Sequence, residues 1–451
     1  MPWRGGRLLL AACAAGILLC VAAASALRLP GEVGSMDPSR TAIYVAYTLV
    51  AGVLFAIGAA IVLWRPPAGR LAVPLIVLAG LAMRAIPFAA PPPLSTDVYR
   101  YVWDGRVQAA GINPYRFLPA DPALASLRDT GAGPAAIYPN INRADYAPTI
   151  YPPVAQAIFA AASFVAPGVW GMKTVMLAFD LLALGATLLI LQACGLPPSR
   201  ILLYAWNPLV VWEFAGGAHV DALATGFSAL ALLAVVRARP GWGGAGLAAA
   251  VLCKLLPAAI APALWRPREW RLPIVAAAVT LAGYAAYASA GWRVLGFLPG
   301  YASEEELGGG GVLLLSLMPT PLPDWATPAY AVVGLLLLAG LALRCLWRPA
   351  TPQAIAVDAL WLTAATMAVL SPHYPWYLTA LAVPAAITPR LTALWLMAAA
   401  PLLYLDPYHL HPQWPALVFL PAIATLAYDL FRHRQPLFDR LPENADVRNA
   451  R

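Results

Sequence analysis

The chain is a series of apolar runs, most of them about as long as a bilayer is thick, and this pattern constrains its fold most strongly. Of its 451 residues, 61% are hydrophobic and only 11% are charged, against roughly 25% charged residues in ordinary soluble domains. A run of about 20 apolar residues spans the hydrocarbon core as a helix, because a helix satisfies its own backbone hydrogen bonds. The sequence therefore predicts an all-α polytopic integral membrane protein.

The placement of arginine predicts how these runs are oriented. Arg65 and Arg70 follow the second apolar run, and further arginines lie in the short loops of the later runs. Cytoplasmic loops carry an excess of basic residues, so topology accounts for the net charge of +8, which gives no sign of nucleic-acid binding. With the N-terminus in the cytoplasm, we expect about 12 to 13 transmembrane helices and an external loop at residues 91–150.

Two apolar runs conflict with this orientation if they cross the bilayer fully. The run at 150–166 is short and begins with a Tyr-Pro-Pro break, whereas the run at 243–264 has arginines on both flanks and contains Lys254 and Pro257. A charge beside a helix breaker is tolerated at membrane depth only where protein or water surrounds it. We therefore expect 150–166 to be re-entrant or half-buried and 243–264 to form a broken hairpin.

Two interpretations of the first apolar run, within residues 1–27, remain open. Small residues near Ala24 and Ala26 resemble a signal-peptide cleavage site, but a run of about 20 apolar residues favours a retained helix. The five cysteines are odd in number, lie within or beside apolar runs and form no Cys-x-x-Cys. We therefore expect neither a disulfide framework nor a metal cluster.

The longest polar interval follows three consecutive prolines and begins STDVYRYVWDGRVQAAGINPY. Wound as a helix, it carries five polar side chains on one stripe: Asp97, Arg100, Tyr101, Asp104 and Gln108. This pattern predicts an amphipathic helix at the membrane surface. Asp97 lies where the preceding apolar run leaves the bilayer, so we interpret it as a candidate catalytic carboxylate; an N-cap role is the alternative.

The predicted topology brings further polar residues to the same external side. These are Glu213, His219, Asp221, Glu304, Glu305, Glu306, His373, His409 and His411. We expect some of them to line one outward-facing cavity with lipid as its side wall. His219 and Asp221 are two residues apart and would alternatively pair with each other, and Glu304–Glu306 precede four glycines and suggest a solvated loop or lid.

Five motifs follow one another between about Arg84 and Tyr377: STDVYRYVWDGRVQAAGINPY, IYPPVAQ, NPLVVWEFAGGAHVDAL, CKLLPAAIAPAL and SPHYPWYL. As an ordered set they resemble the bacterial GT-C membrane glycosyltransferases of the mannosyltransferase-like, glycosyltransferase family 87 type. The resemblance implies a GT-C-like fold, a polyprenyl-phosphate-linked sugar donor and an acidic base at the start of the first external loop, here Asp97. Relatives often have two adjacent acids where this chain has Thr96-Asp97, so no cofactor is predicted and a divalent metal is left open.

The resemblance also suggests a division of the chain. Residues 1–70 would be additional N-terminal transmembrane helices, and residues 71–320 the catalytic core with the external loop 91–150. Residues 321–451 would be C-terminal transmembrane helices.

Glycosyl transfer from a lipid phosphate requires a base for the acceptor hydroxyl and cations for the departing phosphate. Arg84, Arg100 and His373 are our candidates for the phosphate. Aromatic residues at the membrane boundary suit sugar stacking or act as belt anchors. The full set of candidate substrate-binding residues is Arg84, Arg100, Tyr101, Asp104, Tyr151, His219, Asp221, Lys254, His373, Tyr374 and Trp376.

We therefore expect a glycosyltransferase of the bacterial inner membrane that moves a hexose, mannose by the resemblance, to a lipid or glycan hydroxyl on the extracytoplasmic side. No GxGxxG or Walker pattern is present, in agreement with a donor that is not a nucleotide. A transporter or flippase is the alternative, because it also places charges and broken helices at membrane depth. A lipid-carrier polymerase or ligase is a further alternative. The lack of an internal repeat and the gathering of polar groups at one face favour the enzyme.

Overall fold

The computed structural model describes residues 4–67, 69–129, 131, 133–304, 312–318, 322–349, 351–406 and 411–431. Within these ranges every regular element is a helix and none is a β-strand, which confirms the predicted all-α fold. Glu305, Glu306 and His409 lie outside the described residues.

The helices have the following bounds. The first half of the chain forms α1 (Arg4–Ser25), α2 (Pro38–Trp64), α3 (Ala72–Phe88), α4 (Asp97–Ala109), α5 (Pro153–Val165), α6 (Val169–Ala193), α7 (Leu202–Ala205), α8 (Pro208–Val210) and α9 (Asp221–Val236). The second half forms α10 (Pro240–Val251), α11 (Ala261–Leu264), α12 (Arg271–Ala285), α13 (Leu298–Glu304), α14 (Leu313–Ser316), α15 (Ala326–Trp347), α16 (Pro352–Leu370), α17 (Ala382–Ile387), α18 (Leu391–Ala399) and α19 (Gln413–Phe431). Short 3₁₀ helices are η1 (Pro122–Leu127), η2 (Tyr138–Asn140), η3 (Pro198–Ile201), η5 (Leu256–Ile260), η6 (Ala288–Leu295), η7 (Pro375–Leu381) and η8 (Ala400–Leu405), and η4 (Val211–Gly216) is a π-helix.

Five described helices are long and apolar enough to cross a membrane: Gly5–Ser25, Pro38–Trp64, Val169–Ala193, Ala326–Trp347 and Pro352–Leu370. The number rises to seven if two bent pairs, Pro208–Gly216 with Asp221–Val236 and Arg271–Ala285 with Ala288–Leu295, each count as one span. The chain is thus polytopic, but fewer single helices reach spanning length than the 12 to 13 expected. Proline is one cause, since it removes a helical donor, and Pro401 lies at the start of η8, directly after α18.

The two runs expected to be partial crossings are short or broken. α5 has 13 residues and so extends about 20 Å, less than the hydrocarbon core. The run at 243–264 is split into α10, η5 and α11. Lys254 at the break pairs with Asp221, and Arg266, after α11, interacts electrostatically with Asp358.

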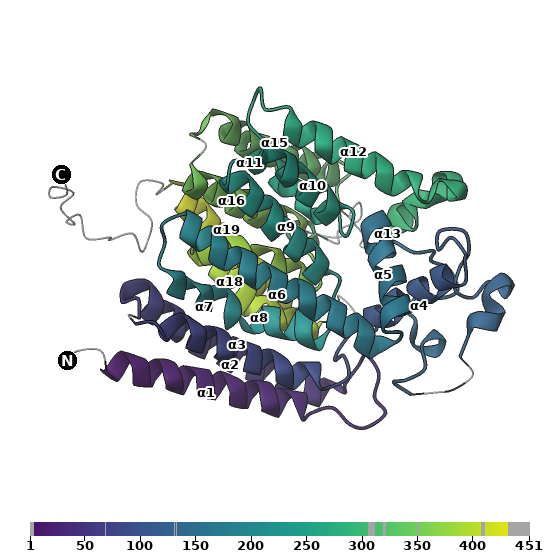
Figure 1. The fold of residues 1–451 in the computed structure, drawn as a ribbon, viewed down its shortest axis with the longest axis horizontal. Helices are drawn as coiled ribbons and strands as arrows, with labels where there is room; N and C mark the ends of the chain where they lie inside the picture. The colour runs from purple at the N-terminus through teal and green to yellow at the C-terminus, as the bar shows by residue number, and fades with distance from the viewer. Residues whose placement is uncertain are drawn as a thin grey trace.

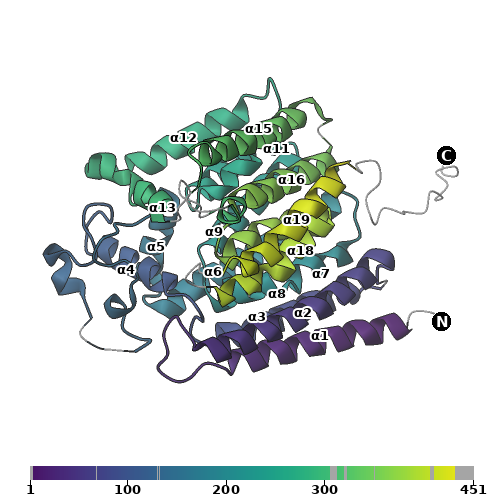
Figure 2. The same ribbon diagram turned by 180° about the vertical axis from the view of Figure 1, so that it is seen from behind.

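Two ends of the helical bundle are distinct in the ribbon views. α4, α5 and α13 gather at one end, which we call the α4 end (Figure 1). α1 begins and α19 ends at the opposite end, which we call the basal end, and the view from behind agrees (Figure 2). α1, α2 and α3 lie along one side of the bundle, and α12 and α15 lie along the other. The long polar interval is therefore remote from the start of α1.

α4 begins at Asp97, but it does not lie with one face on a membrane surface as predicted. Its residues from Val98 to Gly105 are all buried, including the polar ones. The cause is that α5 and the loop that follows α4 cover the polar face. Gly105 permits the close approach of α5, because a Cβ there would overlap the Ser163 hydroxyl and the Phe159 carbonyl.

Candidate active site

A cavity of about 1230 Å³ lies at the α4 end, between the segment that leads into α4, the loop before α5, α15 and α16. Its polar lining includes Asp97, Tyr101, Asn142, Arg143, Tyr151, Asp221, Lys254, Tyr374, Trp376 and Tyr377. Its apolar wall includes Leu335, Leu338, Ala339 and Ala342 of α15 and Leu362, Met367 and Leu370 of α16. Seven of the twelve sequence-predicted site residues thus line one cavity: Asp97, Tyr101, Tyr151, Asp221, Lys254, Tyr374 and Trp376.

Asp97 is partly exposed to this cavity and is held from one side. Asn142 Nδ2 donates to Asp97 Oδ1 over 2.8 Å. Among the described residues, no group donates a hydrogen bond to the other oxygen, Oδ2. Thr96 is the N-cap of α4, so the alternative role of Asp97 as the N-cap is not observed. The carboxylate is therefore oriented by one neutral amide and keeps one oxygen available.

Arg143 follows Asn142 and brings a cation to the same cavity. Its backbone φ of 55° lies in the left-handed region, an uncommon conformation for a residue other than glycine. Arg143 Nε lies 2.8 Å from Glu304 Oε2, and the Tyr146 hydroxyl donates to Glu304 Oε1 over 2.5 Å. Burial acts to lower the pKa of Arg143, but Glu304 together with Tyr374, Asp97 and Tyr151 outweighs burial and raises the pKa. This contact joins the first loop to α13 beside the cavity.

The second cation of the cavity is Lys254, which pairs with Asp221. Lys254 Nζ lies 2.8 Å from both carboxylate oxygens of Asp221 and 3.6 Å from the ring centre of Tyr377. Asp221 occupies the first turn of α9, where the helix dipole also favours a negative charge. The break in the 243–264 run therefore serves to place a lysine against this carboxylate.

His219 does not pair with Asp221, and that alternative is wrong. His219 Nδ1 lies 3.0 Å from Glu213 Oε2, and the Tyr404 hydroxyl donates to both oxygens of Glu213 at 3.0 Å. The π-helix η4 carries Glu213, and π-helical turns are frequent at functional sites. His219 and Glu213 are both buried and do not line the cavity.

Three stacked rings connect His219 to the cavity. The ring centres of His219 and Trp376 are 4.1 Å apart with 20° between the planes, and those of Trp376 and Tyr374 are 4.7 Å apart with 7° between the planes. Trp376 and Tyr374 line the cavity. The buried histidine thus supports the aromatic wall from behind. His373 lies next to these residues in the chain and is not among the lining residues.

Arg84, Arg100 and Asp104 lie outside the cavity lining, in buried polar contacts within the protein. Arg84 Nε lies 2.6 Å from Asp180 Oδ2, and Arg84 Nη1 donates to the Ala205 carbonyl over 2.6 Å. The counter-charge of Arg84 is thus the Asp180 carboxylate of α6. These contacts occupy the donors that we had expected to bind phosphate.

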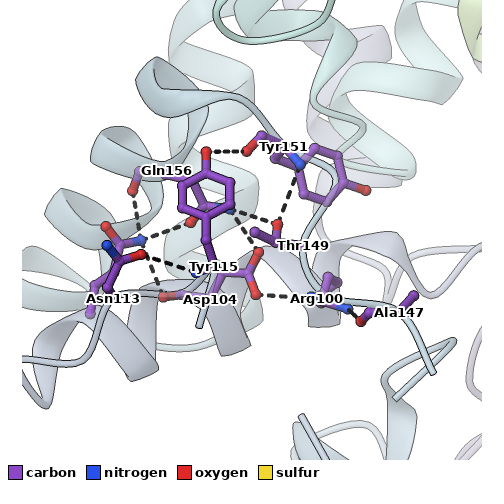
Figure 3. A network of polar contacts seen from close by, with 9 residues as sticks. Arg100, Asp104, Asn113, Tyr115, Ala147, Thr149, Tyr151 and Gln156 are labelled. Carbon is purple, nitrogen blue, oxygen red and sulfur yellow. Dashed lines mark hydrogen bonds and ion pairs between the residues drawn. The ribbon is translucent and has the colours of Figure 1, made fainter. Parts of the chain in front are cut away.

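Arg100 and Asp104 belong to a network that shapes the loop before α5 (Figure 3). Arg100 Nε lies 2.8 Å from Asp104 Oδ1 and Arg100 Nη1 donates to the Ala147 carbonyl, while Gln156 Nε2 donates to Asp104 Oδ2 over 2.9 Å. The Tyr115 hydroxyl donates to the Tyr151 carbonyl over 2.7 Å. The network thereby fixes the backbone that presents the Tyr151 side chain to the cavity.

Lys173 is a buried lysine that our sequence analysis did not single out. Its Nζ donates to the carbonyls of Pro87, Ala90 and Gly216 at distances of 3.1, 2.7 and 3.0 Å. It therefore ties the end of α3 and Ala90, seven residues before Asp97, to the π-helix that carries Glu213. The sequence does contain a signal for Lys173, because a lysine inside an apolar run needs a polar partner. Asn142 and Arg143 were also missed, and their loop offers no periodic pattern.

The described residues contain no group of three or more His, Cys, Asp or Glu side chains arranged to hold a metal ion. At the start of α4, Asp97 has the amide of Asn142 as its neighbour and no second carboxylate in the preceding position. The expectation of a cofactor-free site stays a prediction.

Comparison with known proteins gives one match. The family model described as alpha-(1->6)-mannopyranosyltransferase, N-terminal domain, matches residues 5–266. The matched part is more than half of the chain and contains Asp97, Asn142, Arg143, Asp221 and Lys254. It also contains α1 and α2, and the division of the chain at residue 70 stays a prediction. No curated protein and no solved structure matches.

Proposed function

Because this chain belongs to the alpha-(1->6)-mannopyranosyltransferase family, we propose that it transfers mannose from a polyprenyl-phosphate-linked donor to a hydroxyl of a lipid or glycan acceptor. The chain is a membrane mannosyltransferase by family and by its long apolar helices. In our proposal the cavity at the α4 end faces the extracytoplasmic side of the bacterial inner membrane, and Asp97 is the general base.

The observation that carries the proposal is the two-part lining of the cavity. Asp97, Arg143 and Lys254 provide charges at one part, and α15 and α16 provide an apolar wall at another. A polyprenyl-phosphate-linked sugar has the same two-part character, a polar head on a long hydrocarbon chain. Much of α15 is exposed, for example Leu335 at 68%, and this helix would border the surrounding lipid, from which such a donor would enter.

In the proposed reaction, the acceptor hydroxyl donates its proton to Asp97 Oδ2 while its oxygen attacks the anomeric carbon of the sugar. The bond between that carbon and the phosphate oxygen breaks, and the polyprenyl phosphate leaves with the electron pair. Proton transfer to a positioned carboxylate contributes about 10²–10⁴-fold to a rate. The products are the mannosylated acceptor, the lipid phosphate and a protonated Asp97, which then releases its proton to water.

The departing phosphate needs positive charge close to the cavity, and Arg143 and Lys254 are the lining residues that carry it. A guanidinium group binds phosphate oxygens through paired hydrogen bonds. These residues replace Arg84 and Arg100 as our phosphate-binding candidates, since the latter two are held in buried contacts elsewhere. Tyr374 and Trp376 offer ring faces on which the sugar can stack.

The test is transfer of radiolabelled mannose from a polyprenyl-phosphate donor by membranes that contain wild-type protein, Asp97→Asn or Asp145→Asn. Asp145 is an exposed carboxylate in the loop that also carries Asn142, and it is the matched control. We expect wild type and Asp145→Asn to transfer the label and Asp97→Asn to lose at least about 100-fold in rate. Equal transfer by Asp97→Asn would exclude Asp97 as the base, and no transfer by wild type would refute the proposed donor.

A further inference from the structure

Three arginines lie near one buried aspartate at the basal end. This aspartate is close to the start of α16, whereas the cavity lies at the other end of that helix. Arg348 Nη1 lies 2.5 Å and Arg344 Nη2 lies 3.5 Å from Asp358 Oδ1, and the Asp358 side chain is fully buried. Arg266, in the segment between α11 and α12, interacts electrostatically with Asp358 and Arg348. We call Arg266, Arg344 and Arg348 the basal arginine cluster.

Within the described part of the chain, Arg266 makes only some of the hydrogen bonds that its guanidinium group can donate. Arg266 Nη1 donates to the carbonyls of Ala263 and Trp265, but its Nε and Nη2 are buried without a hydrogen-bond partner. Burial lowers the pKa of Arg266, and the attraction of Asp358 offsets only part of this effect. Among the described contacts, Arg344 and Arg348 share Oδ1 of Asp358 and Arg266 is attracted to the same carboxylate, whose Oδ2 is also buried without a hydrogen-bond partner. A buried polar group without a partner requires an explanation, such as an ion that is not part of the protein.

The surroundings of the cluster indicate the depth of a lipid headgroup. Trp270 and Trp347 flank it in the chain and are 62% and 78% exposed, and exposed tryptophan is typical of the membrane–water interface. Leu343, beside Arg344, is 49% exposed. The Arg344 and Arg348 side chains are themselves 29% and 33% exposed, so an anion can reach them.

We infer that the basal arginine cluster binds the phosphate of an anionic phospholipid headgroup. Arg344 and Arg348 would contact the phosphate oxygens directly, and the positive charge of Arg266, whose Nε and Nη2 are buried, would attract the phosphate over a longer distance. Basic pockets between transmembrane helices are known to hold anionic headgroups. Free phosphate offers the same charge, but the exposed Leu343 and Trp347 favour a ligand that also carries acyl chains. The inference does not depend on the proposed glycosyl transfer.

Such a lipid would join three segments of the chain. α15 provides Arg344 and the residue that ends it, Arg348, while α16 provides Asp358 and Arg266 follows α11. α15 also supplies part of the apolar wall of the cavity. Lipid bound at the basal end would therefore stabilise the packing of α15 against α16, at a distance from the site itself.

The test uses full-length protein purified in an uncharged detergent, with native mass spectrometry and thermal unfolding as readouts. Phosphatidylglycerol, phosphatidylcholine and inorganic phosphate are added separately to wild type, Arg266→Gln and Arg239→Gln. Arg239 is an exposed arginine in the loop before α10 and is the matched control. We expect phosphatidylglycerol alone to bind and to raise the Tm, Arg266→Gln to bind it about tenfold more weakly, and Arg239→Gln to behave as wild type.

Several outcomes would overturn the inference. Equal binding of phosphatidylcholine, or an equal loss in Arg239→Gln, would mean that the interaction is not specific to the cluster. Equal stabilisation by inorganic phosphate would identify a free anion and exclude the lipid. If Arg266→Gln fails to fold, wild-type protein is crosslinked with photoactivatable phosphatidylglycerol instead. Crosslinks in peptides that contain residues 263–270 or 343–349 would support the site. Crosslinks only in other peptides would refute it.

Discussion

Asn142 reaches across 45 residues of chain to donate a hydrogen bond of 2.8 Å to Asp97. The donor is a neutral amide on a loop, and the acceptor lies in the first turn of α4. The contact fixes the plane of the carboxylate without occupying Oδ2. Asn142 is therefore a positioning residue in the proposed reaction, acting through Asp97.

Replacement of Asn142 by alanine should lower kcat by roughly 10- to 150-fold and leave KM for the donor nearly unchanged. The physical reason is the loss of one charge-assisted hydrogen bond, worth about 1.5–3 kcal/mol. Asn140→Ala is the control, because Asn140 lies in the same loop but bonds only to the carbonyls of Gly133 and Ala136. An equal fall in kcat for both variants would show that loop folding, not the orientation of Asp97, is being measured.

The pair of Lys254 and Asp221 makes a separate prediction about stability. Lys254→Met should destabilise the protein by about 3–5 kcal/mol, since it leaves a mostly buried carboxylate without its counter-charge. Lys254→Met combined with Asp221→Asn should recover most of that loss while transfer activity stays low. Thermal unfolding of the single and double variants, with a transfer assay in parallel, measures both effects. A double variant as unstable as the single one would contradict the prediction.

Much of the cavity lining was predictable because topology could be inferred from arginine placement. Once the ends of the apolar runs are assigned to sides, Asp97 and Asp221 fall on one side, and the structure brings both to one cavity together with Lys254 and Trp376. Lys254 was noticeable because a charge beside a proline is rare at membrane depth. The all-helical fold was predictable because a helix satisfies its own backbone hydrogen bonds inside the bilayer.

The partners of buried charges were not predictable in the same way. Arg84 is 96 residues from Asp180, and nothing local in the sequence connects them. His219 was expected near Asp221, but the π-helix η4 brings Glu213, six residues earlier, to its ring. Arg100 and Asp104 have the i, i+4 spacing of an intrahelical ion pair, and this signal should have argued against a substrate role.

The stack of His219, Trp376 and Tyr374 predicts that Trp376 serves the substrate and is not only a membrane anchor. Trp376→Ala should raise KM for the donor by roughly tenfold, and Trp376→Phe should retain most of the affinity because a ring remains in the stack. Trp325→Ala is the control, since Trp325 is 65% exposed and does not line the cavity. If both alanine variants change KM equally, the effect comes from membrane anchoring.

Acid pH should loosen the loop between α4 and α5 through Asp129. Burial acts to raise the pKa of this carboxyl, but the N–H of Ile137, the Arg106 guanidinium and the N–H of Tyr138 outweigh burial and hold the pKa below its usual range. A group with a lowered folded pKa stabilises the fold above its unfolded pKa of about 3.9, and this stability is lost as the pH falls through the folded pKa. Hydrogen exchange of peptides covering residues 122–140, corrected for intrinsic rates at each pH, measures the effect.

The expected pattern distinguishes Asp129 from the other carboxylates of that loop. Wild type should be protected at pH 7 and lose protection below about pH 4. Asp129→Asn should be less protected at pH 7 and depend less on pH, because its single amide oxygen can replace only one of the two carboxylate oxygens that accept hydrogen bonds and it has no charge for Arg106. Asp145→Asn should follow wild type, since Asp145 is exposed. Protection in Asp129→Asn that equals wild type at pH 7 would mean that Arg106 and the two N–H donors do not hold this loop, and the acid loosening would then need another carboxylate.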